Sequence, residues 1–177
     1  MSYKGKYVVK NPCKYAGDVT NVVWRSLWER LVMVWADTNK DVVKWASEAI
    51  IIPYICATDG KQHRYFVDFY VEFKDGKKML IEVKPAEQTK PPRTAKKLNE
   101  TAAKSNSKTR QRLLKEVKTY AKNVSKWEAA TQFANKHNMT FLIVTEKNVE
   151  SILGIRFIAD GRSTRRLSKA TTKPLNK

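Results

Sequence analysis

Two strand-like segments joined by an Asp-Gly turn constrain the fold of this chain most. Residues 65–69 (YFVDF) and 80–84 (LIEVK) are rich in aromatic and branched side chains, and residues 74–77 between them (KDGK) are typical of a β-hairpin turn. Because side chains alternate across a strand, Glu82 and Lys84 lie on the same face of the second strand. The opposite face of that strand carries Met79, Ile81 and Val83.

Asp68 is the unusual residue of the first segment, since it stands among aromatic and aliphatic neighbours. Burying a carboxylate there without a partner is expensive. Two carboxylates about 4 Å apart repel by about 4 kcal/mol at an effective dielectric constant of about 20. A divalent cation between Asp68 and Glu82 turns this repulsion into attraction, and hard oxygen ligands suit Mg²⁺ or Mn²⁺. The pattern predicts a metal-dependent phosphodiesterase site.

An alternative interpretation needs no site. Glu82 and Lys84 would then form the solvated face of an edge strand, where charged side chains prevent aggregation. This alternative gives no reason for Asp68 inside an aromatic strand.

The charge of the chain indicates a polyanionic partner. Lys and Arg number 35 against 17 Asp and Glu, so the formal charge is +18 over 177 residues. Nucleic acid is the favoured partner. A membrane is the weaker alternative, because the sequence contains no long apolar run. Two cysteines and two histidines supply neither a disulfide framework nor a His-rich metal site. No signal peptide is visible, and a cytoplasmic location is expected.

The remaining pattern predicts a mixed α/β domain. Apolar residues recur at helical spacing over residues 21–36, and an apolar strand follows over residues 49–55. This strand and the hairpin are expected to form a three-stranded meander. Helical spacing returns over residues 113–124, and Ser125-Lys126-Trp127-Glu128 has the capping-box spacing of a further helix. Residues 140–145 predict a buried strand parallel to its neighbour.

Three basic or irregular segments surround this pattern. Residues 1–20 are expected to form an irregular N-terminal arm, and residues 156–177 a basic C-terminal tail. Within the domain at residues 21–155, a polar and strongly basic insert is expected at about residues 85–112, with one marginal helix over Arg93–Lys104.

Asp68 followed by Glu82-Val83-Lys84 resembles the D…ExK signature of PD-(D/E)XK nucleases. Ser26-Leu27-Trp28-Glu29-Arg30 is similar to the S-x-x-E motif of the TnsA-like endonuclease group, and residues 141–146 also fit that group. The resemblance covers about residues 22–146. Size, charge and basic ends look most like the head completion nucleases of tailed phages.

The resemblance implies a restriction-endonuclease-like core that runs helix, three-stranded meander, helices, strand. It also implies that Asp68, Glu82 and the carbonyl of Val83 bind Mg²⁺ (or Mn²⁺), with Glu29 completing the metal sphere. Lys84 would position the attacking water or stabilise the transition state. The expected contacts to the DNA backbone are Lys90, Arg93, Lys96, Lys97, Arg110 and Arg112.

Glu29 has a second interpretation, because Ser26-x-x-Glu29 is also a capping box. On a helical wheel Glu29 lies away from the apolar stripe. The predicted helix starts before Trp24, however, which would leave Ser26 too late to be its cap.

The expected function is Mg²⁺-dependent hydrolysis of DNA phosphodiester bonds, as endonuclease or exonuclease. As the resemblance implies, it would trim packaged phage DNA during head completion and head–tail joining. Phage portal or neck proteins are then expected partners, in the host cytoplasm or the virion. Two alternatives stay open: a non-catalytic basic DNA-binding or head-joining protein, and a restriction or transposition endonuclease of the same superfamily. Neither a membrane nor a cofactor beyond the metal is expected.

Overall fold

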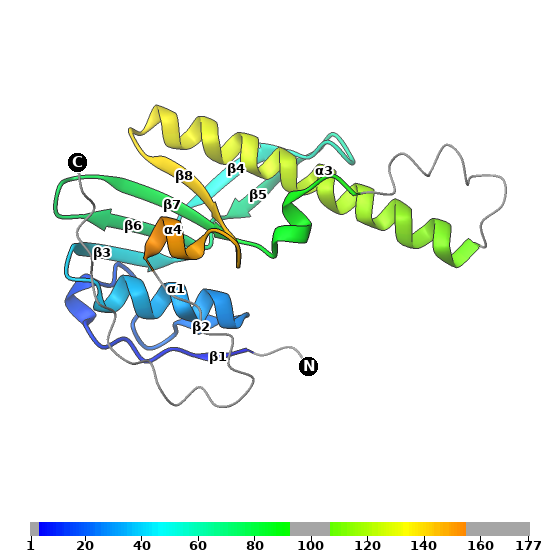
Figure 1. The fold of residues 1–177 in the computed structure, drawn as a ribbon. Coiled ribbons are helices and arrows are strands. Elements are labelled where there is room, and N and C mark those ends of the chain that lie inside the picture. The colour runs from blue at the N-terminus through cyan, green and yellow to red at the C-terminus, as the bar shows by residue number, and fades with distance from the viewer. Residues whose placement is uncertain (1–3, 93–106, 155–177) are drawn as a thin grey trace.

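The computed structural model describes residues 4–92 and 107–154 (Figure 1). In chain order the elements are β1 (Gly5–Lys6), η1 (Pro12–Lys14), β2 (Val23–Trp24), α1 (Leu27–Thr38), β3 (Val42–Ser47), β4 (Ile51–Ile55), β5 (Gln62–Phe66), β6 (Phe69–Phe73), β7 (Lys78–Val83), η2 (Ala86–Thr89), α3 (Ser107–Lys136), β8 (Thr140–Val144) and α4 (Val149–Leu153). No helix among these residues has the length and apolar character needed to cross a bilayer.

A four-stranded mixed sheet with the order β3-β6-β7-β8 forms the centre of the fold. β6 pairs antiparallel with β3 and β7, and the predicted Asp-Gly turn joins β6 to β7, with Gly76 at a φ of 81°. β8 pairs parallel to β7, because α3 carries the chain back across the sheet before β8 begins. The predicted mixed α/β class, hairpin and parallel strand are therefore confirmed. The prediction that residues 140–145 form a buried strand was wrong, because β8 is an edge strand whose side chains are mostly half-buried.

The sheet has a hydrophobic core on each face. Ile81 and Val83 pack on the side of α1 and α4, whereas Leu80 packs on the side of α3 together with Ala130 and Ala134. Figure 1 shows α1 and α3 on opposite sides of the sheet. The alternation predicted for the strand that carries Glu82 is confirmed, and it directs Glu82 and Lys84 to the α3 side.

The predicted first helix begins too early. Residues 23–24 form β2, which pairs with β1, and α1 starts only at Leu27. The side chain of Ser26 accepts a hydrogen bond from the N–H of Glu29, so Ser26 is the N-cap. The conclusion that Ser26 lies too late to cap the helix was wrong, because Trp24 contributes its apolar side chain from a strand rather than from a helical turn.

The predicted three-stranded meander is also wrong in its strands. Residues 42–47, which lie ahead of the three predicted strands, form edge strand β3 of the central sheet. Residues 51–55 belong instead to a separate two-stranded sheet, in which β4 pairs with β5. The segment 65–69 is divided between the two sheets, since β5 ends at Phe66 and β6 begins at Phe69.

The two helices expected after the insert are one continuous helix, α3. Ser125 does not cap a new helix. Its hydroxyl donates to the carbonyl of Ala121 one turn earlier and accepts from the N–H of Ala57 at 3.1 Å. The hydroxyl is thus occupied by a mid-helix bond and by the link to the β4–β5 turn.

The N-terminal segment is irregular for most of its length, but it packs on the core. Tyr7 is buried, and its hydroxyl donates to the carboxylate of Asp37 at 2.8 Å. The N–H groups of Lys10 and Asn11 donate to the same carboxylate at 2.7 and 3.0 Å. The helix expected over residues 93–104 and the tail at residues 156–177 lie outside the described residues.

Candidate active site

The candidate site lies where the chain passes between the two sheets. Ser47 pairs with Phe69 in the central sheet, and Ile51 pairs with Phe66 in the smaller one. At this break Glu48 has a positive φ of 54°, and its N–H donates to the carbonyl of Asp68 at 3.1 Å. Such interruptions of a ladder turn a side chain out of its regular direction. Asp68 therefore sits at a sheet end rather than inside a strand.

The break brings Asp68 to the end of β7. The N–H of Val83 donates to Oδ2 of Asp68 at 2.8 Å. This contact sets the Asp68 carboxylate beside the segment Glu82–Lys84, so the structure brings together the acid, the second acid and the lysine that the sequence predicted.

Glu82 is almost completely buried, with 2% exposure, and both of its oxygens have partners. The hydroxyl of Tyr65 donates to Oε2 at 2.6 Å, and Nζ of Lys84 lies 2.9 Å from Oε1. A carboxylate oxygen carries two lone pairs, so each can bind a cation as well as its present partner. Tyr65, on β5, is a site residue that the sequence analysis missed, because its partner is known only from the tertiary structure.

The electrostatics of the site are those of two crowded acids. Burial first, and then the neighbouring Glu82, raises the pKa of Asp68 to about 8, while the Val83 N–H and Lys84 oppose the shift. Burial works to lower the pKa of Lys84, but Glu82 and Asp68 outweigh it, and the net shift is upward. Lys84 therefore stays protonated, and its single positive charge offsets part of the negative charge of both acids.

Glu29 caps the start of α1 in a variant of the capping box, in which it accepts from the N–H of the residue before the N-cap. Its Oε2 accepts from the N–H of Arg25 at 2.7 Å, and its Oε1 accepts from Oγ of Ser26 at 3.0 Å. Glu29 is nevertheless close enough to contribute to the raised pKa of both Asp68 and Lys84. The capping role that the expected start of the helix argued against is thus present, together with proximity to the predicted site.

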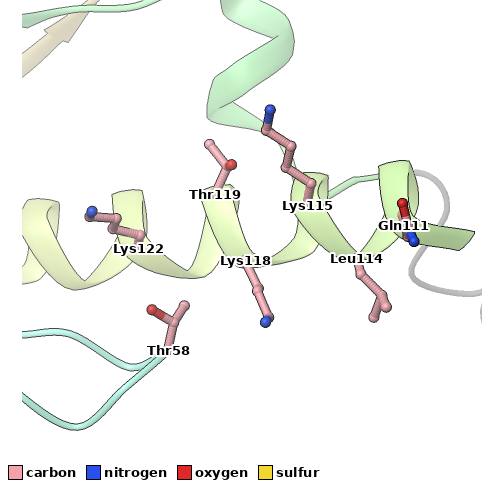
Figure 2. Close-up of a pocket in the computed structure, with 7 residues that line it drawn as sticks. All are labelled: Thr58, Gln111, Leu114, Lys115, Lys118, Thr119 and Lys122. Atoms are coloured by element: carbon pink, nitrogen blue, oxygen red, sulfur yellow. The ribbon is translucent and has the colours of Figure 1, made fainter. Parts of the chain in front are cut away.

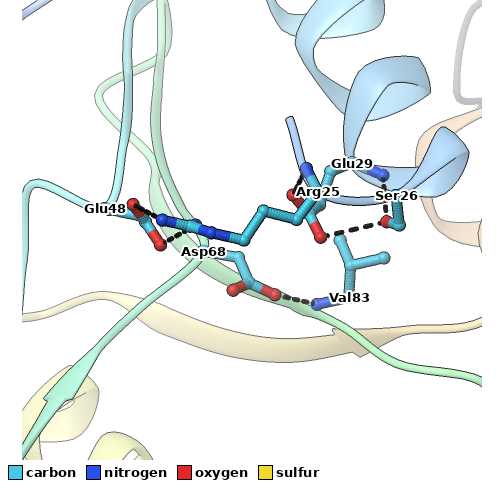
Figure 3. Close-up of polar contacts among 6 residues, drawn as sticks. All are labelled: Arg25, Ser26, Glu29, Glu48, Asp68 and Val83. Carbon is cyan, nitrogen blue, oxygen red and sulfur yellow. Dashed lines mark hydrogen bonds and ion pairs between the residues drawn. The ribbon is translucent and has the colours of Figure 1, made fainter. Parts of the chain in front are cut away.

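A cation that the sequence analysis did not single out extends across these acids. The guanidinium of Arg25 forms an ion pair with both oxygens of Glu48, with 3.0 Å between Nη2 and Oε2. Its pKa is raised by Glu48 first, and Glu29 and Asp68 add to the shift. Figure 3 shows Arg25 stretched from the start of α1 to Glu48, with Asp68 beside it.

The residues predicted to hold DNA are only partly within the described chain. Lys90 follows η2, and Arg110 and Arg112 lie in the first turns of α3; all three are exposed. Arg112 is paired with Glu116 on the same helix. The predicted contacts Arg93, Lys96 and Lys97 lie outside the described residues.

The oxygen ligands of Asp68 and Glu82 fit a hard divalent cation, because added positive charge relieves the repulsion that raises the pKa of Asp68. The carboxylate oxygens of Glu29, Asp68 and Glu82 do not all lie within 4.8 Å of one another, whereas the possible ligand atoms of another group of described residues do. Within residues 4–92 and 107–154, the three-residue group whose ligand atoms all lie within 4.8 Å of one another is Cys56, Asp59 and His63. Its thiol and imidazole suit a softer ion than Mg²⁺.

We expect Asp68→Asn to stabilise the metal-free protein, and the gain to grow with pH. The raised pKa means that ionising Asp68 costs folding free energy above its ordinary pKa of about 3.9, with the full cost reached above about pH 8. Asparagine keeps an oxygen for the Val83 N–H and carries no charge. The increase in melting temperature over wild type, measured in EDTA, should be small at about pH 5 and largest at about pH 8.

Asp75→Asn is the matched control, since Asp75 is an exposed acid whose pKa is lowered by Lys77. It should not stabilise the protein at either pH. A gain for Asp68→Asn that is independent of pH would contradict the electrostatic cause.

Two comparisons with known proteins identify the family of this chain. A sequence model described as "TnsA-like endonuclease N terminal" matches residues 39–146, which include Asp68, Glu82 and Lys84 but not Glu29. The chain is also 38% identical over 152 residues to the Head completion nuclease of Enterobacteria phage T4; this similarity covers 86% of this chain and 97% of the phage protein. The chain therefore belongs to the TnsA-like endonuclease family and is a nuclease.

Proposed function

We propose that this nuclease hydrolyses phosphodiester bonds of DNA in a reaction that requires Mg²⁺ or Mn²⁺ at Asp68 and Glu82. The observation that supports this most is the unrelieved proximity of the two acids. The pKa of Asp68 is raised to about 8 by burial and by Glu82, even though Lys84 and the Val83 N–H are already in place. A site that still lacks positive charge with its own lysine present is suited to a cation.

Asp68 and Glu82 would hold the ion, with the Val83 carbonyl beside them. A bound divalent ion supplies a water of lowered pKa and neutralises charge on the phosphate. The Val83 N–H fixes the orientation of the Asp68 carboxylate, and the Tyr65 hydroxyl fixes that of Glu82. Such fixed carboxylates need little reorganisation when substrate binds.

Lys84 would act on the substrate. Its side chain is 25% exposed, and its ammonium group stays protonated because the nearby acids raise its pKa. Its ammonium group has three N–H donors. It can therefore donate to the attacking water or to a phosphate oxygen and keep its ion pair with the buried Glu82.

Glu29 and Glu48 would complete the site on the α1 side. The Arg25 guanidinium now lies among Glu29, Glu48 and Asp68. A cation or a phosphate that enters would compete for these partners, and Arg25 would then be free to bind a phosphate oxygen.

For the biological role we propose trimming or cutting of packaged phage DNA during head completion and head–tail joining. The support is the similarity to the phage T4 protein, which extends over nearly the whole of both chains. Portal or neck proteins would be partners in this role, in the host cytoplasm or in the virion.

The test is cleavage of supercoiled and linear DNA by purified wild type and Asp68→Asn, with Mg²⁺ titrated from EDTA upward. Wild type should cut only with metal, and Asp68→Asn should lose cleavage by about a hundredfold or more. The control variant Asp75→Asn, which changes an exposed acid in the turn of the same hairpin, should cut like wild type. Wild type that binds DNA but cuts none at any metal concentration would instead support a non-catalytic DNA-binding protein.

A further inference from the structure

A row of lysines runs along one side of α3 toward the candidate site. Lys115, Lys118, Lys122 and Lys126 are spaced by three, four and four residues. At about 100° per residue these positions fall within an arc of about 80°, and at about 1.5 Å per residue they span about 16 Å of the helix. We refer to these four residues as the α3 lysine row.

The far end of the row borders a groove of about 350 Å³. Lys115, Lys118 and Lys122 line it from α3, and Thr58 lines it from the turn between β4 and β5. Figure 2 shows these side chains around this part of the helix. In Figure 1 the first turns of α3 extend beyond the sheet.

The near end of the row reaches the acids. Nζ of Lys126 lies 5.2 Å from the centroid of the Tyr65 ring, and the hydroxyl of Tyr65 donates to Glu82. Burial first, and then Lys84 and Lys122, lowers the pKa of Lys126, while Glu82 and Asp68 oppose this shift. Lys126 is thus within electrostatic reach of both acids and of the next lysine in the row.

No acidic side chain among the described residues pairs with the lysines of the row, and the Tyr65 ring is the contact of Lys126. Among residues 4–92 and 107–154, none of the four ammonium groups forms a hydrogen bond or an ion pair. By contrast, Arg112 on the same helix is paired with Glu116. Three like charges around one groove, with a fourth half-buried beside the acids, are unfavourable for folding alone and suit a polyanion.

We propose that the α3 lysine row binds consecutive phosphates of one DNA strand and leads that strand to Asp68 and Glu82. Lys126 contacts the phosphate nearest the cleaved bond, and Lys118 and Lys122 hold the phosphates that follow. Lysine contacts of this kind position the backbone without reading its sequence. This proposal rests on the proposed function, since it assigns the substrate path to that same site.

The test measures binding of a short fluorescent duplex and of its single strand by fluorescence anisotropy, in EDTA so that no cutting occurs. The double variant Lys118→Ala/Lys122→Ala should bind about tenfold or more weakly at about 0.1 M salt. The slope of log K against log salt concentration should fall by about 2. Lys40→Ala/Lys44→Ala removes the same charge near the opposite sheet edge, at exposed positions, and should change affinity much less.

A second pair of variants addresses Lys126, whose side chain also packs on Tyr65. Lys126→Arg should keep the affinity for DNA, whereas Lys126→Met, which preserves the packing volume, should lose it severalfold. Equal binding by both would assign Lys126 a packing role and overturn its phosphate contact.

In cleavage assays with Mg²⁺, Lys118→Ala/Lys122→Ala should raise KM and leave kcat near that of wild type. Equal affinity of this variant and the Lys40→Ala/Lys44→Ala control overturns the proposed path, even if wild type cuts DNA normally. Weakened binding by the row variant together with an inactive wild type would keep the path for a DNA strand and reject the proposed function.

Discussion

Replacing Lys84 by alanine is expected to lower DNA cleavage by about a hundred- to a thousandfold, the cost typical of losing one positioned donor in an active site. Lys84 forms an ion pair with Glu82 at 2.9 Å and lies within electrostatic reach of Asp68. In the proposed reaction no other described side chain on β7 can supply a proton-donating group at that place. Single-turnover cleavage at saturating DNA and Mg²⁺ measures the loss directly.

Lys78→Ala is the matched control, because Lys78 is the first residue of β7, whereas Lys84 directly follows its last residue. It should cut like wild type. Lys84→Ala also leaves the buried Glu82 without its ion pair, so a lower melting temperature in EDTA is expected. Folding must therefore be checked for the variant by its melting transition in Mg²⁺. A folded Lys84→Ala protein with wild-type single-turnover rates would contradict the assigned role.

Replacing Asp37 by alanine is expected to cost about 3–5 kcal/mol of the free energy of unfolding, the largest stability effect that we anticipate. Asp37 is fully buried in the last turns of α1, and its carboxylate accepts from the Tyr7 hydroxyl and from the N–H groups of Lys10 and Asn11. Alanine would leave these three donors without an acceptor. Because these bonds attach the N-terminal segment to the core, exposure of that segment to protease should also increase.

Urea unfolding followed by tryptophan fluorescence measures the effect on Asp37→Ala and Asp37→Asn. Asparagine keeps one acceptor oxygen, so its loss should be smaller than that of alanine. Asp41→Ala, at an exposed acid just after the same helix, should change stability by less than about 0.5 kcal/mol. If Asp37→Ala unfolds at the same urea concentration as Asp41→Ala, the buried carboxylate does not hold the segment.

The candidate site divides into residues that the sequence predicts and residues that it does not. Asp68, Glu82 and Lys84 were identified from strand alternation and from one turn. Tyr65, Arg25 and Lys126 were not, since their approach to the acids depends on how separate sheets and helices pack. Tyr65 belongs to a different sheet, and Lys126 to a helix that crosses the opposite face from α1.

The break between the two sheets illustrates why local pattern was insufficient. Residues 65–69 have the composition of one strand, but the chain changes partners within them, from β4 to β3. This change depends on the positive φ of Glu48 and on its bond to the Asp68 carbonyl. Neither is encoded in the periodicity of the segment that contains Asp68.

The start of α1 and the continuity of α3 were likewise decided by tertiary contacts. Trp24 continues the apolar spacing of α1, yet it belongs to strand β2, which pairs with β1. Ser125 has the spacing of a cap, yet the N–H of Ala57 uses its hydroxyl from outside the helix.

By itself, the sequence determined the hairpin, the faces of β7, the parallel strand β8 and the positive charge, because periods of two residues, turn chemistry and composition are local properties. The tertiary structure alone decided where the chain breaks between sheets, which helix turn Glu29 caps, and which cations reach the acids. Those features depend on hydrogen bonds and charges between residues far apart in the chain, and a local pattern carries no information about such pairs.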